Sequence, residues 1–447
     1  MSYIRKRLKS VAEILPEPLG RLVVAVPYSW RLGRKYTETR REIEEFSTLQ
    51  KEEQREYIFQ RIRGIVEHAY DNIRFYRSHY EEYNFSPEAL KDFDDIQQIP
   101  IVTKDDLRQW RLEERSHVET DQVKMNTGGT SGSPLHFYLD RNAFAREWAH
   151  MHNIWESLGY QRTDRKLTIR GANVGDRPYK YNAVHNEYII NTYKPFKDTE
   201  SSILELAKEK DIKYIHGYPS AIYEFARYCQ RSAPKLVNEL SSTLRGVLLG
   251  SEYPAPVYRE TIDEVFDGQS LSWYGHSEMA VFAPERSSEY VYEPMHTYGY
   301  SEAVPGEEGE HRLLGTSYYN TASPFIRYDT GDRVGKVDME DGILQAFEIT
   351  AGRVGEFITD QSGHRISLTG LIFGRHHEIF EYAQFVQVRQ DEPGRATIVV
   401  TPSSEIARVG AIEWYELFDD TNVDIDINVE VVDSPVRSPQ GKVKLLV

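Results

Sequence analysis

The sequence has very little cysteine and no long apolar run. Cys229 is the only cysteine among 447 residues, which excludes an intrachain disulfide and any zinc or iron–sulfur site built from several cysteines. No apolar stretch approaches the ~20 residues of a membrane-spanning helix, and no small-residue cleavage site follows an apolar leader. We therefore expect a cytoplasmic protein without a membrane span.

Blocks of like charge are also scarce. The chain has 54 basic and 70 acidic residues, and its net charge of −16 is spread along the sequence, which argues against a nucleic-acid partner and favours a small-molecule ligand. A short basic amphipathic pattern does occur near the N-terminus, at Arg5, Lys6, Arg7 and Lys9. It could rest on an anionic membrane surface as a peripheral contact, although we favour a solvated helix end.

The N-terminal part predicts helices. Residues 36–80 carry apolar side chains at helical spacing, and these form one stripe: Ile58, Ile62, Ile65, Val66, Ala69, Ile73 and Tyr76. Thr103 and Asp106 have the spacing of a capped helix start. We therefore expect a helical N-terminal region over residues 1–110.

The middle of the chain alternates helices and strands. Strand patterns occur at 166–169, 214–215 and 244–249, and helical patterns precede or follow them at 141–158, 203–208, 219–228 and 254–266. This alternation indicates an α/β architecture with a largely parallel sheet. Ligands bind at the strand ends of such sheets, so residues 250–252 and 272–278 are candidate site segments, made neighbours by a crossover helix.

Beyond Arg353 the pattern changes to a small α+β domain. Hairpin signals occur at 362–364 and 392–394, a helix is expected over 406–417, and apolar residues alternate over 423–431. We predict two domains: a large domain over residues 1–352 and a small domain over residues 353–447.

Residues 127–134, Thr-Gly-Gly-Thr-Ser-Gly-Ser-Pro, combine glycines and hydroxyls without an apolar anchor. Glycines allow successive N–H groups to point at one anion, and hydroxyls add donors, which is typical of phosphate binding. Apolar alternation on both sides indicates strand, loop, strand. A nucleotide-hydrolase loop needs lysine where Ser133 stands, which argues against that class. The alternative is an ordinary hairpin turn.

Three further segments carry polar side chains. At a predicted strand end, Tyr274, Ser277 and Glu278 offer an aromatic face, a hydroxyl and a hard oxygen ligand for Mg²⁺. The alternative role of Ser277, a hydrolase nucleophile, needs glycine where Met279 stands. Asp332 lies in an acidic turn over 328–332 that could accept ribose hydroxyls, although a plain Asp-Gly turn is the simpler explanation.

Together these motifs resemble the adenylate-forming superfamily of acyl-CoA synthetases and adenylation domains, and within it the phenylacetate-CoA ligase group and its CapK-like capsule-biosynthesis relatives. The resemblance extends from about Leu90 to Lys442 with the motifs in the same order. It implies a large N-terminal adenylate-forming α/β domain with mixed sheets and helices, and a small mobile C-terminal α+β domain. The implied enzyme is an AMP-forming ligase. It uses ATP and Mg²⁺ to turn a carboxylic acid into an acyl-adenylate, releases pyrophosphate, and then transfers the acyl group to coenzyme A or an amine.

The resemblance also implies a role for individual residues. The loop at 127–134 grips the β- and γ-phosphates, residues 250–252 lie along the adenine, and Tyr274 stacks on the base. The implied catalytic residues are Lys442, Glu278 and Thr130. The implied nucleotide-binding residues, in chain order, are Thr127, Gly128, Gly129, Thr130, Ser131, Gly132, Gly250, Ser251, Glu252, Tyr274, Gly275, Ser277, Asp332, Arg353 and Lys442.

Among these, Ser277 is expected to touch the α-phosphate, Glu278 to hold Mg²⁺ and Asp332 to bind the ribose. Arg353 is expected to stand at the start of the hinge, and Lys442 to bridge the carboxylate and the α-phosphate. Without the resemblance, Arg353 would be read as one member of a surface ion pair and Lys442 as a lysine of the C-terminal tail.

The sequence also departs from the usual motifs of this family. Leu135 stands where many members have lysine, and Gly355 stands where a hinge acid or lysine is common. His216 and Tyr218 fall near the implied acid pocket, but core packing explains them equally well, and the identity of the acid does not follow.

Two other functions stay open. One is a non-catalytic nucleotide-binding protein that retains the fold, and the other is an amide-forming ligase that acts on an amine or amino sugar in polysaccharide biosynthesis. A homodimer is a further candidate assembly.

Overall fold

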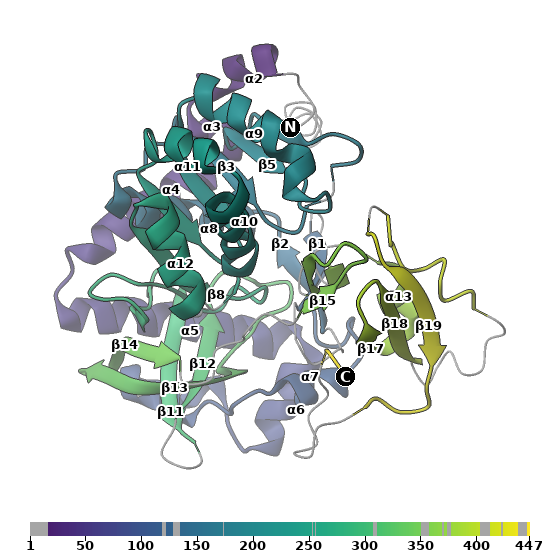
Figure 1. The fold of residues 1–447 in the computed structure, drawn as a ribbon. Coiled ribbons are helices and arrows are strands. Elements are labelled where there is room, and N and C mark those ends of the chain that lie inside the picture. Colours follow the sequence, from purple (N-terminus) through teal and green to yellow (C-terminus); the bar gives the residue numbers. More distant parts are fainter. Residues whose placement is uncertain are drawn as a thin grey trace.

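The protein is seen in a computed structural model. The structure describes residues 17–118, 122–127, 135–172, 174–252, 254, 256–306, 311–349, 357–368, 371–372, 377–402, 412–421, 423–436 and 445–447. Figure 1 shows helices and two sheets on one side of the molecule and a smaller group of strands, β15 to β19, on the other.

The described N-terminal part, from residue 17, is mainly helical, and residues 1–16, with the basic pattern at Arg5 to Lys9, lie outside the described residues. Its elements are α2 (Glu17–Val24), α3 (Tyr28–Leu32), α4 (Arg34–Ser47), α5 (Lys51–Asn72), α6 (Arg74–Glu82), the 3₁₀ turns η1 (Pro87–Ala89) and η2 (Phe93–Gln98), and α7 (Lys104–Arg108). The predicted apolar stripe is confirmed, because all seven of its side chains are buried. The expected continuous helix over 36–80 is wrong: it is interrupted before α5, where Gln50 and Glu53 form a capping box, and again at Ile73.

The large sheet is mixed and carries the predicted parallel strands. Within the described residues its seven strands run in the order β4-β5-β3-β6-β7-β8-β9, and only the outer two, β4 and β9, pair antiparallel. The strands are β3 (Arg165–Ile169), β4 (Tyr179–Asn182), β5 (Glu187–Ile190), β6 (Ile212–Gly217), β7 (Gly246–Leu249), β8 (Ser270–Gly275) and β9 (Phe282–Pro284).

Helices cover both faces of the large sheet (Figure 1). One face packs on α9 (Phe196–Glu209), α10 (Pro219–Ser232), α11 (Pro234–Ser241) and α12 (Pro256–Phe266). The opposite face packs on α8 (Ala143–Trp155), which ends in the 3₁₀ turn η3 (Glu156–Leu158). The predicted alternation of strands and helices is therefore confirmed, since strands buried on both faces need a helical cover on each.

A second sheet is antiparallel throughout. Within the described residues its strands run in the order β10-β14-β13-β12-β11. They are β10 (Val291–Tyr292), β11 (Gly299–Pro305), β12 (His311–Ser317), β13 (Tyr328–Glu340) and β14 (Ile343–Ile349). The expected acidic turn over 328–332 is wrong, because these residues begin β13. Gly331, at φ +81°, lies where the β12–β13 register shifts, so the strand bulges instead of turning.

The predicted strand–loop–strand around residues 127–134 is confirmed in its flanks. Strands β1 (Gln122–Asn126) and β2 (His136–Asp140) pair antiparallel, with Asn126 opposite His136. Thr127 is 2% exposed and closes the base of the loop: its N–H donates to the Leu135 carbonyl, and its Oγ1 accepts the Leu135 N–H, both at 3.0 Å. Residues 128–134 lie outside the described residues.

The C-terminal part has a core of its own, built from residues between Ile358 and Leu445. Its elements are β15 (Phe357–Thr359), β16 (Arg365–Ser367), α13 (Ile379–Tyr382), β17 (Ala383–Glu392), β18 (Arg395–Pro402) and β19 (Asp426–Val431). Both predicted hairpins are present. The helix expected over 406–417 is wrong for residues 414–417, which form turns, and residues 406–411 lie outside the described residues, as do Arg353 and Lys442.

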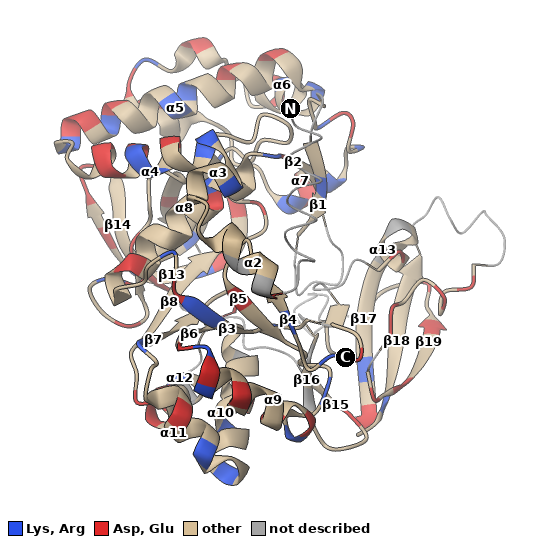
Figure 2. Ribbon diagram, turned by 90° about the horizontal axis from the view of Figure 1, so that it is seen from above, with Lys and Arg blue, Asp and Glu red and all other residues tan. Residues whose placement is uncertain are grey.

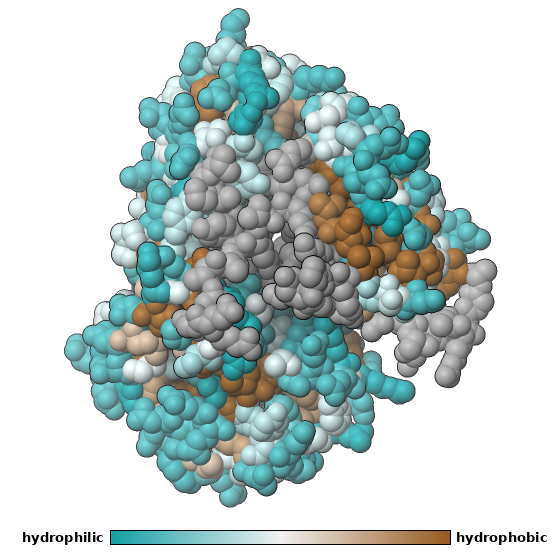
Figure 3. All heavy atoms as spheres, turned by 60° about the horizontal axis from the view of Figure 1, so that its bottom comes forward, coloured by the Kyte–Doolittle hydropathy of each residue, from teal (hydrophilic) through white to brown (hydrophobic). Residues whose placement is uncertain are grey.

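The surface of the described part fits the charge pattern of the sequence. Acidic and basic residues are interspersed over α4, α5 and α9 to α11 (Figure 2). Figure 3 shows apolar side chains gathered on part of the surface. In the described C-terminal part, Tyr415, Val431 and Val436 are exposed. Among the helices that the structure describes, none is both long and apolar enough to cross a membrane.

Candidate functional site

The carboxyl ends of β7 and β8 lie side by side. The two strands are parallel neighbours with Leu249 opposite Ser272, which confirms the expectation that both strand ends share one edge. Gly250 follows β7 directly, and its N–H donates to the Gly217 carbonyl at 3.1 Å. A Cβ at Gly250 would lie 2.2 Å from Cζ2 of Trp273, so only glycine fits this position.

Tyr274 and Asp332 join the large sheet to the antiparallel sheet. The Tyr274 hydroxyl at the end of β8 donates to Oδ2 of Asp332 in β13 at 2.6 Å. The Tyr274 ring contacts Phe347 edge to face, with centroids 5.8 Å apart. The bulge at Gly331 lets the Asp332 N–H bond to the Thr330 hydroxyl at 3.2 Å. An aromatic face and a carboxylate are thereby held together, the two groups needed to bind a base and a ribose.

Glu278 is a buried carboxylate held from two sides. It is 7% exposed, His276 Nδ1 lies 3.1 Å from its Oε2, and the Tyr328 hydroxyl donates to its Oε1 at 3.2 Å. The backbone N–H of Val281 donates to Nε2 of His276 at 3.0 Å, so Nδ1 is the nitrogen that donates to Glu278. These bonds fix the orientation of the carboxylate.

Electrostatics keep Glu278 ionised. Burial alone raises its pKa, but His276, which bonds to the carboxylate, and the positive charge of Lys104 lower the pKa to about 2. Its anionic oxygens suit Mg²⁺. Among the residues that the structure describes, no group of three or more His, Cys, Asp or Glu could hold a metal, so a Mg²⁺ ion at Glu278 would need ligand and water oxygens to complete its shell.

Lys104 comes near Glu278 because α7 is anchored to β13. The Thr103–Asp106 capping box predicted from the sequence is present. The Val102 N–H donates to the Arg327 carbonyl at 3.2 Å, and Asp329 N–H donates to the Val102 carbonyl at 2.9 Å. Lys104, His276 and Tyr328 were not predicted as site residues from the sequence. The latter two lie inside recognised motifs, but spacing does not reveal which side chains meet.

The other expected site residues divide into two groups. Ser251, with φ +70°, and Glu252 follow Gly250 at the same edge, and Gly275 and Ser277 follow Tyr274. No helix follows β8; a turn leads into β9, so Ser277 lacks the strand-to-helix setting of a nucleophile elbow. The remaining group lies outside the described residues and stays a prediction: Gly128, Gly129, Thr130, Ser131, Gly132, Arg353 and Lys442.

His216 lies at the end of β6, on the face of the sheet that packs on α8. Its ring is 7% exposed and lies 5.1 Å from Trp155 and 6.1 Å from Trp273, between ring centroids. Burial lowers its pKa to about 3, so the ring is neutral, and Nδ1 has no hydrogen-bond partner among the described residues. Packing explains the ring but not the unpaired nitrogen.

Comparison with known sequences identifies relatives at low identity. No protein-family profile matches the chain. It is 24% identical to the protein CapK of Staphylococcus aureus over 281 residues, which cover 62% of this chain and 61% of CapK. It is 25% identical to the phenylacetate-coenzyme A ligase of Escherichia coli K12 over 298 residues, which cover 61% of this chain and 65% of the ligase. The chain thus spans less than two thirds of the length of these curated relatives.

Solved structures share the fold. A 2-hydroxyisobutyryl-CoA ligase in complex with 2-HIB-AMP and CoA in the thioesterification state gives a TM-score of 0.55 at 18% identity, covering 90% of each chain. The same ligase in the postadenylation state with R3-HIB-AMP gives 0.51 at 17% identity, again covering 90% of each chain.

Proposed function

We propose that this chain activates a carboxylic acid with ATP and transfers the acyl group to coenzyme A. Its sequence relatives include CapK and phenylacetate-CoA ligase, and its fold is that of adenylate-forming acyl-CoA ligases. The observation that carries this proposal is the convergence of Gly250, Tyr274, Asp332 and Glu278 at one edge of the large sheet. Gly250 follows β7, Tyr274 lies in β8, Glu278 lies in the turn after β8, and Asp332 lies in β13. Together they would combine a base platform, a ribose acceptor and an ionised carboxylate.

The described residues would bind the nucleoside part of ATP. Tyr274 would present its ring to the adenine, and Gly250 lies at the end of the neighbouring strand β7. The hydrogen bond between Tyr274 and Asp332 ties the base platform to the ribose acceptor. The phosphates would extend toward Ser277, Glu278 and the loop at 127–134, whose N–H groups and hydroxyls suit anions.

Glu278 would hold Mg²⁺ at the phosphates. The low pKa fits this role, because the carboxylate is ionised before the cation arrives. When bound, Mg²⁺ supplies charge stabilisation for the transferring phosphoryl group.

In the first step, a carboxylate oxygen of the acid attacks the α-phosphorus of ATP. The bond between the α-phosphorus and the bridging oxygen breaks, and pyrophosphate leaves. Lys442 would bridge the carboxylate and the α-phosphate, where negative charge develops in the transition state.

In the second step, the thiol of coenzyme A loses its proton to water and its sulfur attacks the acyl carbon. The bond from that carbon to the AMP oxygen breaks, and AMP leaves. Movement of the small domain over residues 353–447 would withdraw Lys442 and admit the acceptor. We favour coenzyme A because a phenylacetate-coenzyme A ligase is among the sequence relatives and a ligase of the same fold is seen in complex with CoA. We place the reaction in the cytoplasm, where ATP and reduced thiols are available.

Pyrophosphate release tests the proposal. The full chain is incubated with ATP, Mg²⁺ and a panel of aromatic, fatty and hydroxy acids, with and without coenzyme A. We expect release with at least one acid, and we expect Lys442→Ala to abolish it while ATP still raises the melting temperature. Release that is unchanged in Lys442→Ala would refute the role of that lysine. A nucleotide-binding protein without catalysis would show the ATP effect and no release.

A further inference from the structure

The first two described helices, α2 and α3, carry an exposed apolar face. Trp30 on α3 is 76% exposed and Leu22 on α2 is 70% exposed, which makes them the two most exposed large apolar side chains among the described residues. Leu19, one turn before Leu22, is 54% exposed. Single apolar residues are normal on a protein surface, but three such side chains so close together along the chain indicate a binding surface.

The opposite face of α2 is fixed on the large sheet. Gly20 lies against β4, because a Cβ at this position would lie 2.9 Å from Cε1 of Tyr181. Val23 packs against the core on one face of the large sheet, and Glu17 forms an ion pair with Lys210 at 3.4 Å. Positions 17, 20 and 23 share one side of a helix, so the two leucines at positions 19 and 22 are turned away from the sheet.

Arg31 holds α3 next to α2. Its guanidinium donates to the carbonyls of Val26 at 2.9 Å, Val184 at 2.7 Å and Val24 at 3.5 Å. Figure 1 shows both helices in the upper part of the molecule, and Figure 2, which looks down on that side, shows them next to each other. The turn between α2 and α3 is therefore fixed, and the exposed side chains of the two helices belong to one side of the protein.

A basic segment precedes this face along the chain. The first twelve residues contain Arg5, Lys6, Arg7 and Lys9 and no acidic residue, whereas the whole chain has a net charge of −16. Lys9 precedes α2 by eight positions, a chain length of at most ~28 Å. Basic charge beside exposed leucine and tryptophan is typical of segments that bind an anionic membrane surface.

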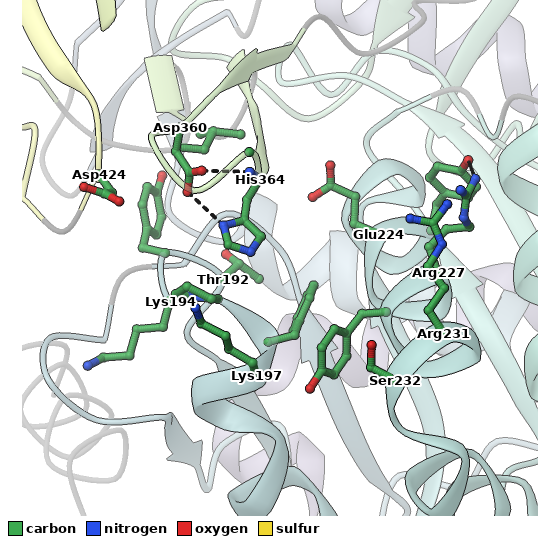
Figure 4. A pocket seen from close by; sticks show the side chains of 17 residues that line it. Thr192, Lys194, Lys197, Glu224, Arg227, Arg231, Ser232, Asp360, His364 and Asp424 are labelled. Carbon is green, nitrogen blue, oxygen red and sulfur yellow. Dashed lines mark hydrogen bonds and ion pairs between the residues drawn. The ribbon is translucent and has the colours of Figure 1, made fainter. Parts of the chain in front are cut away.

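A second group of basic side chains in the described residues has no such apolar neighbours. Lys194, Lys197, Arg227 and Arg231 line a cavity of about 440 Å³ between α10 and the β15–β16 hairpin (Figure 4). None of the exposed large apolar side chains of the described residues belongs to its lining. Because a flat lipid surface does not enter a recess, this second group provides a control for the first.

We infer that the exposed face of α2 and α3, together with the basic N-terminal segment, attaches this protein to the surface of an anionic membrane. The two leucines enter the boundary between headgroups and acyl chains, the Trp30 ring lies at the headgroup level, and the basic side chains bind lipid phosphates. Three large side chains are too few for a stable contact with a second copy or another protein, which takes ~20–30 residues on each side. The attachment goes beyond the proposed function and does not depend on it.

Cosedimentation of the full chain with lipid vesicles tests the attachment. The vesicles contain phosphatidylcholine alone or with about 30% phosphatidylglycerol, an anionic lipid. We expect binding to the anionic vesicles that weakens as salt increases, and binding to the neutral vesicles that is about tenfold weaker or less. Leu22→Ser and Trp30→Ala should each weaken binding about fivefold or more, because each removes apolar surface from the contact. Lys6→Glu should weaken it about tenfold, because attraction becomes repulsion.

Tyr83→Ala and Lys197→Glu are the matched controls. Tyr83 is 60% exposed and follows α6, which lies at the opposite end of the molecule from α2 (Figure 1), and Lys197 belongs to the cavity lining. Both variants should bind vesicles within about twofold of the wild type. Since the side chains changed at positions 22, 30, 83 and 197 are exposed, these four variants should also keep the wild-type melting temperature.

Trp30 fluorescence gives an independent readout. The emission that is present in the wild type and absent in Trp30→Phe should shift to shorter wavelength when anionic vesicles are added, because the indole leaves water.

Absence of binding to anionic vesicles, or equal binding by Leu22→Ser and Tyr83→Ala, overturns the inference. Self-association of the wild type that is lost in Leu22→Ser, without vesicle binding, also overturns it, because the face would then be a contact between copies. Pyrophosphate release is measured without vesicles, so failure of the membrane attachment leaves the proposed function intact.

Discussion

Glu278→Gln removes the charge of the buried carboxylate and keeps its shape. The pKa of Glu278 is lowered from 4.5 to about 2, which corresponds to about 3 kcal/mol of preferential stabilisation of the ionised form in the folded protein. Because the folded pKa lies below the unfolded one, this contribution is complete above pH 4.5 and is lost as the pH falls toward 2. About 2 kcal/mol of it should be lost between pH 7 and pH 3.

The measurement is urea unfolding of the wild type and Glu278→Gln at pH 7 and pH 3. The useful quantity is the change in their stability difference with pH, because any packing effect of the amide is the same at both values. Glu264→Gln, the same change at an exposed glutamate of α12, should show no comparable pH dependence. A wild-type minus Glu278→Gln difference that stays constant from pH 7 to pH 3 would refute the reasoning.

Three further predictions concern the same structure. ATP at ~100 times its dissociation constant should stabilise the wild type by about 2.7 kcal/mol, which is seen as a rise in melting temperature. Asp332→Ala should remove most of this rise, because the variant loses the charge-assisted hydrogen bonds to the ribose. An undiminished rise contradicts the ribose role. Gly250→Ala should destabilise the fold by roughly 1–3 kcal/mol in urea unfolding, because its Cβ would overlap the Trp273 ring; wild-type stability would contradict the overlap. Glu302→Ala should cost about 3–5 kcal/mol, because the charge of Arg327, bonded to Glu302 at 3.0 Å, would remain buried with only the Gln97 and Ile99 carbonyls as partners. A loss no larger than that of Glu264→Ala would contradict this.

The site was predictable where chemistry depends on residues close in sequence. Tyr274, Ser277 and Glu278 share one strand end. Gly250 and Tyr274 lie on either side of a predicted crossover helix, and this predicted correctly that their two strands are neighbours. The contacts of Glu278 were not predictable. Tyr328 and Lys104 come from segments 50 and 174 positions away along the chain, and no periodic pattern relates residues so far apart.

For the fold, too, local features were predictable from the sequence and contacts between remote segments were not. The apolar stripe of α5 and α6 and the capped start of α7 were read correctly because helical spacing is local. The antiparallel sheet was not anticipated, and Asp332 was assigned to a turn. A glycine beside acidic residues has the same sequence signature in a turn as in a bulged strand, and pairing with β12 decides between them.

The sequence by itself determined which chemical groups are present and their order along the chain: the glycine and hydroxyl loop, the polar strand ends and the acid-rich segment. Tertiary structure decided their state. The approach of His276 and Lys104 lowers the pKa of Glu278 although burial raises it, and the Tyr274–Asp332 bond joins two sheets. The reason is that burial and electrostatic energy depend on distances between groups remote in sequence, whereas helix and strand periodicity depends on neighbours.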